Sequence, residues 1–475
     1  MIASPVLDQL RAIVGAHRVL TDAADCAPYG VDRTTIWAPA PGCVVLPSST
    51  EEVQAVVQLA LREQLAVVPS GGRTGLSGGA VAKNGEVVIA LDRMNRVLEL
   101  NAVEGTLHCE AGLITTNLQD AASEAGLFYP VDFASAGSSQ IGGNIATNAG
   151  GIKVIRYGMT RDWVLGLKVV TGTGEILDLN RGLIKNNTGY DLRHLFIGSE
   201  GTLGIICEAT LKLTRQPKEP VVMVLAVTEF AAIMDVLRVF NGGMELNAFE
   251  FFSRNALEKV MAHSNLPEPC ETQAPYYALL EFDVISDEVL DHAMTLFEEC
   301  VEQGSVLDGS VSQSLSQAEN LWRLREDISE TLSHWKPYKN DLSVSVSRMP
   351  AFIEQVDALV AAQYPDFEIV WFGHIGDGNL HLNILKPEQL AVEEFARICG
   401  GVSEQVAALV ADFGGSISAE HGIGLLKKDY IGYSRSPAEL ILMQQIKQVF
   451  DPQGVMNPGK LVDLPAPARQ GADRT

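Results

Sequence analysis

The sequence has little of what would place the protein on a nucleic acid or in a membrane. Its formal net charge is −24 over 475 residues, and an acidic surface argues against both nucleic acids and anionic membranes as partners. No stretch approaches the roughly 18 apolar residues of a membrane span. The N-terminus lacks the basic and apolar segments of a signal peptide. We therefore expect a cytoplasmic protein.

Disulfide and nicotinamide-binding signals are also missing. The seven cysteines are scattered, odd in number and without a C-x-x-C motif, which is typical of reduced thiols. The chain contains no Walker A motif and no G-x-G-x-x-G after an early strand. A nicotinamide-dependent dehydrogenase is therefore disfavoured.

The length and the charge set two further conditions. A chain of 475 residues that is 47% hydrophobic can bury a sizeable core and predicts two or three domains. An anionic substrate would be repelled by the overall charge. It would therefore need a locally positive pocket made of arginine, lysine or a metal ion.

Glycine, in contrast, is abundant and clustered. Five glycines fall within residues 71–79, directly after a strand predicted at 65–68. The N–H groups of such a loop can converge on phosphate oxygens, with hydroxyl donors from Ser70, Thr74 and Ser77. A flexible surface loop is the alternative. A second small-residue region, 132–151, could form the other wall around a pyrophosphate and allow a flat ring close to the backbone.

Histidines form a second concentration of chemically active groups. Alternating apolar residues flank Asp377-Gly378, which predicts a two-residue hairpin turn. This register would place His374 directly opposite His381. Asn383 would lie beside His381 on the same face and opposite Phe372. Two converging imidazoles suit two ligands of a divalent metal, whereas the alternative is a pair of half-buried histidines on a sheet.

A later segment could complete the metal site. A short strand predicted at 415–419 ends at Glu420-His421. Two histidines and one glutamate form a known zinc set that leaves positions for substrate, and Mn²⁺ or Fe²⁺ would also suit these donors. With Glu420 as the third ligand, His421 would lie beside the metal, where a general base belongs.

A helix predicted at 319–335 could supply the positive pocket. Arg325 and Ser329 are four residues apart and share a helix face, and Lys339 follows at the start of a strand. A guanidinium, a hydroxyl and an ammonium could together hold a carboxylate. Each residue alone is more often solvated surface.

The glycine clusters carry a family resemblance. They read PSGGRTG (69–75), GGNIATNAGG (142–151) and GSEGTLG (198–204). In this order they resemble the FAD-binding domain of the vanillyl-alcohol oxidase type of flavoprotein. Covalent relatives often have a histidine after the first Gly-Gly pair. Because Arg73 stands there, we expect non-covalently bound FAD.

The resemblance extends through nearly the whole chain. The motifs HIGDGNLH (374–381), AEHGIG (419–424) and MNPGK (456–460) are similar to those of FAD-linked D-2-hydroxyacid dehydrogenases. It implies cofactor contacts throughout the glycine clusters, with Asn457 and Lys460 facing the flavin ring. These contacts are Pro69, Ser70, Gly71, Gly72, Arg73, Thr74, Gly75, Ser77, Gly78, Ser135, Gly137, Gly142, Gly143, Asn144, Thr147, Asn148, Gly150, Gly201, Ile205, Asn457 and Lys460.

An α+β fold follows from the same resemblance and from the change of pattern near residue 216. We expect a two-part FAD-binding domain (1–215) and a substrate-binding cap domain with the metal site (216–420). A C-terminal segment (421–465) would close over the flavin, and 466–475 would form a flexible tail.

Substrate and partners also follow from the resemblance. In the D-2-hydroxyglutarate dehydrogenase branch, an arginine, a small hydroxyl residue and a lysine hold the distal carboxylate, which matches Arg325, Ser329 and Lys339. Asn383 and His421 would also contact the substrate. The expected reaction is metal-assisted oxidation of D-2-hydroxyglutarate, and of D-malate, by hydride transfer to flavin N5. The chain would form a homodimer and pass electrons to electron-transfer flavoprotein or a quinone.

Two alternatives from the flavoprotein classes stay open at this point. A D-lactate or glycolate dehydrogenase of the same family would have no distal carboxylate to bind and no need of all three groups. A non-catalytic binding subunit of an oxidase complex would keep the flavin loops, but it would not need the metal set and the base.

Overall fold

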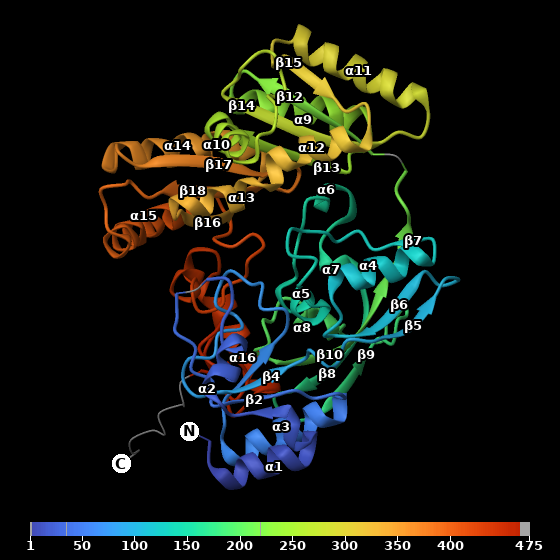
Figure 1. The fold of residues 1–475 in the computed structure, drawn as a ribbon, viewed down its shortest axis with the longest axis vertical. Coiled ribbons are helices and arrows are strands. Elements are labelled where there is room, and N and C mark those ends of the chain that lie inside the picture. Colours follow the sequence, from blue (N-terminus) through green and yellow to red (C-terminus); the bar gives the residue numbers. More distant parts are fainter. Residues whose placement is uncertain (1, 35, 219, 466–475) are drawn as a thin grey trace, which may run out of the picture.

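The computed structural model describes residues 2–34, 36–218 and 220–465. Figure 1 shows two parts, one above the other. The lower part contains the N-terminal elements in blue and teal together with the red C-terminal helix α16 (Pro437–Phe450), and the upper part contains the middle of the chain. The predicted tail, 466–475, lies outside the described residues.

Two sheets form the lower part. The first has the order β1-β2-β4-β3, with the strands β1 (Val19–Leu20), β2 (Cys43–Val45), β3 (Val67–Ser70) and β4 (Val87–Ala90). The second is antiparallel in the order β5-β6-β10-β8-β9. Its strands are β5 (Val97–Asn101), β6 (Thr106–Glu110), β8 (Val164–Thr171), β9 (Ile176–Leu179) and β10 (Gly204–Lys212).

Helices bury the apolar side of these sheets. Ser49 caps α3 by accepting the N–H of Glu52, and the helix then buries Val53, Val56 and Val57 in the core of the lower part. The helices are α1 (Ser4–Val14), α2 (Ala23–Cys26), α3 (Thr50–Glu63), α4 (Thr115–Glu124), α5 (Ile141–Thr147), α6 (Val154–Tyr157), α7 (Thr160–Trp163) and α8 (Arg193–Phe196). β7 (Leu127–Phe128) and β11 (Thr214–Arg215) form a two-stranded sheet, and β11 is the last strand before the chain enters the upper part.

A seven-stranded antiparallel sheet organises the upper part, in the order β15-β12-β14-β13-β17-β18-β16. Its strands are β12 (Pro220–Val227), β13 (Ala248–Ser253), β14 (Tyr276–Asp283), β15 (Val306–Val311), β16 (Tyr338–Ser343), β17 (Glu368–His374) and β18 (Asn379–Leu385). A separate apolar core lies on each face. One includes α9 (Phe230–Gly243), α11 (Asp287–Glu302), α14 (Met349–Gln363) and α15 (Val392–Asp412), and the other α10 (Arg254–Ser264), α12 (Leu315–Glu326) and α13 (Ile328–Thr331).

The chain returns to the lower part after α15. Met456 forms a parallel bridge with Val67 on β3. The buried ammonium of Lys447 holds this connection, because it donates to Thr202 O, Met456 O and the Asp451 carboxylate at 2.8–3.0 Å. All seven cysteines are described, buried and free of disulfides. Among the described helices, none has the length and apolar character that a membrane crossing requires.

An ion cluster joins three strands of the five-stranded sheet. Glu208 on β10 lies 2.9 Å from His108 Nε2 on β6 and 2.8 Å from Lys168 Nζ on β8. The hydrogen bond from His108, reinforced by Lys168, outweighs the cost of burial and lowers the pKa of Glu208 to about 2. A carboxyl whose pKa is lower in the folded state than in the unfolded chain stabilises the fold.

Replacing Glu208 with glutamine is therefore expected to destabilise the fold at pH 7 by about 2 kcal/mol. The stabilisation is fully present above the ordinary glutamate pKa of 4.5 and is lost as the pH falls towards about 2. Thermal unfolding of the wild type and Glu208→Gln should differ most at pH 7, and the gap should narrow below pH 4.5. The matched control is Glu99→Gln, which removes the charge of an exposed glutamate on β5. A gap that does not change with pH would contradict the assignment.

Candidate active site

The three glycine clusters meet around one cavity of the lower part. The cavity encloses about 840 Å³ including its open mouth, within the range of about 300–1,000 Å³ typical of small-molecule sites. His421 and Asn457, which lie far along the chain, complete its wall. The predicted cofactor contacts that line it are Pro69, Ser70, Gly71, Gly72, Arg73, Thr74, Gly75, Ser77, Gly142, Gly143, Asn144, Thr147, Gly201, Ile205 and Asn457.

Six predicted contacts, all within the described ranges, lie outside this lining: Gly78, Ser135, Gly137, Asn148, Gly150 and Lys460. Lys460 differs most from the prediction, because its buried ammonium donates to Val81 O at 2.8 Å rather than facing the cavity. Burial lowers the pKa of Lys460 to about 8. Asn148 accepts the N–H of Arg161, and Gly78 donates to Asp32. Arg73 pairs with Asp92 at 3.1 Å.

The cavity wall fits FAD. Within the described residues, Gln140 Oε1 and Asn457 Oδ1 are buried without a hydrogen-bond partner, and both residues line the cavity. Buried acceptors of this kind require a donor, which the N–H and hydroxyl groups of FAD can supply. A Cβ on Gly72 would lie 2.2 Å from Ser138 O. Gly72 of the first cluster therefore packs directly against the backbone of the small-residue region 132–151, and any larger residue at position 72 would clash with it.

The sequence analysis correctly placed the two histidines of the hairpin on one face of the sheet, but the predicted register of the hairpin is wrong. β17 ends at His374, a 3-10 turn covers Ile375–Asp377, and β18 begins at Asn379. His374 is therefore paired with Asn379, and Phe372 rather than His374 lies opposite His381. The longer turn moves the pairing by two residues. Because side chains alternate with a period of two, both histidines still point to the same face.

The two histidines and Glu420 converge. His374 Nε2 lies 3.3 Å from His381 Nε2 and 3.4 Å from Glu420 Oε1. Ligands about 2.0–2.1 Å from a tetrahedral zinc ion would be separated by about 3.3–3.4 Å, so the set fits a metal ion. The strand predicted at 415–419 is wrong, since Ser416 alone forms a bridge, to Ser343. Glu420 instead lies on a loop.

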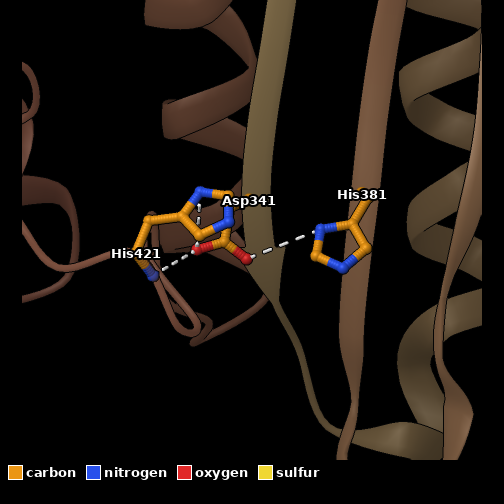
Figure 2. Close-up of side chains that lie close together, drawn as sticks. All are labelled: Asp341, His381 and His421. Carbon is orange, nitrogen blue, oxygen red and sulfur yellow. Dashed lines mark hydrogen bonds and ion pairs between the residues drawn. The ribbon is translucent and has the colours of Figure 1, made fainter. Parts of the chain in front are cut away.

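Two buried carboxylates that the sequence analysis missed orient these side chains. Glu250 on β13 accepts a hydrogen bond from His374 Nδ1 at 2.7 Å. Figure 2 shows Asp341 of β16 between His381 and His421, with Nδ1–carboxylate distances of 3.8 and 3.6 Å. Carboxylates behind metal-ligating histidines fix the ring orientation and the tautomer. No local pattern marks Glu250, because it lies 124 residues before His374.

Asp341 has the geometry of a support rather than of a ligand. Asp341, His381 and His421 lie close enough to hold an ion themselves. The Asp341 carboxylate, however, already accepts the backbone N–H groups of Glu420 and His421 at 3.0 Å and Asn379 Nδ2 at 2.9 Å. Burial opposes its charge, but His421, Lys427 and His381 together with these bonds keep the pKa of Asp341 well below its usual range.

The electrostatics of the cluster favour a bound cation. Burial opposes a charge on His374, but Glu250 and Glu420 outweigh it and raise the pKa of His374 to about 9. Burial, reinforced by Asp341, raises the pKa of Glu420 to about 7. Burial lowers the pKa of His421, so this imidazole is neutral near pH 7 and able to accept a proton.

The predicted carboxylate-binding residues differ in their burial. The helix predicted at 319–335 is broken, because α12 ends at Glu326 and α13 begins at Ile328. Arg325 is buried, with its guanidinium 4.8 Å above the Phe372 ring and Nη2 2.8 Å from Glu250. Ser329 and Lys339 are exposed, and Lys339 Nζ donates to Ser329 Oγ at 2.9 Å.

Three buried atoms around Arg325 and Asn383 lack a hydrogen-bond partner within the described residues. They are Arg325 Nε, Asn383 Oδ1 and Glu250 Oε2, and the last of these contacts Arg325 as an ion pair. Asn383 lies directly opposite Lys339 in the β16–β18 pairing, so the two side chains share one face of the sheet. Arg325 Nε is a free donor and Asn383 Oδ1 a free acceptor, which is the complement of a polar small molecule.

One loop joins the histidine cluster to the flavin cavity. The backbone after Glu420 is held by the lower part, because Glu200 accepts the N–H groups of Ile423 and Gly424 at 2.8 and 2.7 Å. Ser77 Oγ donates to His421 O at 2.8 Å. His421 therefore lines the cavity and stands beside Glu420. The tertiary structure thus places the candidate metal ligands and the candidate base next to the flavin site.

Known structures share this fold. Alkyldihydroxyacetonephosphate synthase superposes with a TM-score of 0.75 at 20% identity, covering 97% of this chain and 86% of that chain. p-Cresol methylhydroxylase superposes with a TM-score of 0.72 at 16% identity, covering 97% and 96%. At such identities the likeness shows the fold alone, and it confirms the predicted α+β architecture.

Sequence relatives identify the family. Residues 216–461 match the C-terminal domain of FAD linked oxidases, and residues 41–180 match the FAD binding domain. D-2-hydroxyglutarate dehydrogenase of Stutzerimonas stutzeri (strain A1501) is 58% identical over 96% of this chain and 98% of its own length. The mitochondrial enzyme of that name from Rattus norvegicus is 37% identical over 95% and 83%. The chain therefore belongs to the D-2-hydroxyglutarate dehydrogenase family of FAD-dependent oxidoreductases.

Proposed function

We propose that the protein oxidises D-2-hydroxyglutarate, and also D-malate, to the corresponding 2-oxo acid. The proposal is supported by a second set of groups that can bind a carboxylate, Arg325, Ser329 and Lys339. Arg325 contacts Glu250, the partner of His374, and Lys339 contacts Ser329 and is paired with Asn383. One carboxylate and the hydroxyl group need only the metal site. The second set is needed only when the substrate has a carboxylate at its far end.

Each group of residues has its own role in this reaction. His374, His381 and Glu420 hold a divalent metal ion, for which zinc suits the donor set and the spacing best. Bound FAD supplies a two-electron acceptor for the C2 hydride at N5, and the metal ion supplies a Lewis acid for the hydroxyl oxygen. Arg325, Ser329 and Lys339 hold the far carboxylate and so orient C2, while Asn383 contacts the bound acid.

His421 acts as the general base. Its Nδ1 faces Asp341 at 3.6 Å, so Nε2 is free to take the proton of the substrate hydroxyl. The charge of Asp341 then stabilises the imidazolium that forms. Transfer of the hydroxyl proton to His421 and of the C2 hydride to FAD would convert the alcohol into a carbonyl. FAD would gain two electrons and one hydrogen, and the proton would leave His421 to the solvent, so the step balances.

A D-lactate or glycolate dehydrogenase is the second candidate, because it would use the same metal set, base and flavin. The buried Arg325 disfavours it, since a monocarboxylate leaves this cation without a substrate partner. The acceptor, either electron-transfer flavoprotein or a quinone, the homodimer and the cytoplasmic location stay predictions.

Anaerobic addition of D-2-hydroxyglutarate to the purified yellow protein is expected to bleach the visible absorbance of the oxidised flavin. D-Malate should do the same more slowly, and D-lactate and glycolate should have little effect. Metal analysis of the same sample should find about one zinc ion per chain. Faster bleaching by D-lactate than by D-2-hydroxyglutarate would overturn the substrate assignment.

A further inference from the structure

One buried carboxylate connects the candidate metal ligand with the candidate substrate arginine. Glu250 is 1% exposed. Its Oε1 lies 2.7 Å from His374 Nδ1, and its Oε2 lies 2.8 Å from Arg325 Nη2. Glu250 therefore has a position from which it can transmit changes between the two sites.

We propose that Glu250 is a positioning residue that couples recognition of the far carboxylate to the strength of the metal site. The inference rests on the proposed function, since it uses the roles assigned there to His374 and Arg325. Glu250 accepts a hydrogen bond from Nδ1–H of His374, which leaves the Nε2 lone pair for the ion and makes the imidazole a stronger ligand. Arg325 opposes this effect, because its positive charge draws on the same carboxylate.

Strand pairing and ring packing hold Glu250, His374 and Arg325 in contact. Glu250 lies directly opposite His374 in the β13–β17 pairing, and Phe252 lies opposite Phe372. The Phe372 ring supports the Arg325 guanidinium from below at 4.8 Å. Arg325 is 5% exposed and His374 7% exposed, so water screens these charges poorly and their mutual influence is strong.

Substrate binding should shift this balance. A carboxylate that binds Arg325 offsets the guanidinium charge, so Glu250 is left freer to polarise His374. The ion would then be held most strongly when a dicarboxylate is in place. A monocarboxylate leaves the guanidinium charge uncompensated, and the site would discriminate against it at the metal as well as at the pocket.

Two substitutions should move metal affinity in opposite directions, although both lower turnover of D-2-hydroxyglutarate. Glu250→Gln keeps the size of the side chain and removes its charge, and the Kd for Zn²⁺ is expected to rise about 10–100-fold. Arg325→Met removes the opposing charge and leaves Glu250 in place, and the Kd is expected to fall by about threefold or more. A purely structural role for both residues would weaken metal binding in both variants.

The test is a Zn²⁺ titration of the FAD-loaded, metal-stripped full chain in competition with a chelator. Glu281→Gln is the matched control. Glu281 is a buried acid of β14 that contacts Lys153 and Trp322, and the Kd of this variant for Zn²⁺ should equal that of the wild type. Flavin absorbance and circular dichroism report folding in each variant. Arg325→Lys, which keeps the charge, replaces Arg325→Met if that variant does not fold, and its Kd should stay within about twofold of the wild type.

The outcomes separate the two proposals. A wild-type protein that binds no Zn²⁺ would overturn the metal assignment in the proposed function. A wild type that binds Zn²⁺ and a Glu250→Gln variant that binds it equally well would overturn the coupling alone. Weaker binding by both Glu250→Gln and Arg325→Met would also overturn it.

Discussion

Replacing His374 with alanine is expected to reduce turnover of D-2-hydroxyglutarate by about 10³-fold or more while the protein keeps its FAD. The substitution removes one of three proposed ligands, and Lewis-acid stabilisation by a metal is worth several kcal/mol. The cavity that fits FAD is lined by other residues. The measurements are steady-state kinetics with an artificial electron acceptor, the visible spectrum and the metal content of the purified variant.

His263→Ala is the control for this experiment, because His263 is an exposed histidine of α10 whose ring lies tilted against that of His334. It should retain turnover, flavin and metal. Full activity in a metal-free His374→Ala protein would rule out the proposed mechanism. Loss of flavin together with activity would instead show that the histidine cluster is part of the cofactor site.

Replacing Lys339 with methionine is expected to lower kcat/KM for D-2-hydroxyglutarate about 10–100-fold, mainly through KM. A hydrogen bond to a charged group is worth about 1.5–3 kcal/mol, and a contact far from the reacting carbon contributes similarly to ground-state and transition-state binding. D-Lactate has no second carboxylate, so its kinetics should change by about twofold or less. Replacing Lys339 tests the far carboxylate more specifically than replacing Arg325, because Arg325 also contacts Glu250.

A substrate panel on wild type, Lys339→Met and Lys218→Met measures this effect. Lys218 is an exposed lysine in the segment before β12, and its substitution should leave both substrates unaffected. Equal losses for D-2-hydroxyglutarate and D-lactate in Lys339→Met would reject the dicarboxylate pocket. An unchanged D-2-hydroxyglutarate KM would remove Lys339 from the substrate site.

The errors of the sequence analysis share one physical cause. The hairpin register, the break between α12 and α13, and the irregular loop before Glu420 all depend on what packs around them. Gly378 illustrates this, since a Cβ there would lie 2.3 Å from Val344 O. The turn is shaped by a contact with a neighbouring segment as well as by its own Asp-Gly pair. An even register shift preserved the shared face of the histidines, and the predicted convergence survived for that reason.

The sequence by itself determined the flavin-binding fold, the family and the chemical types of the candidate ligands. These depend on glycine spacing and on short motifs in which the interacting atoms lie close along the chain. Only the tertiary structure decided which carboxylates support the histidines and how the Glu420 loop reaches the flavin cavity. Glu250 and His374 are 124 residues apart, and Glu200 and Ile423 are 223 apart. Such partners meet only through strand pairing and domain contact, for which a local pattern of residues carries no signal.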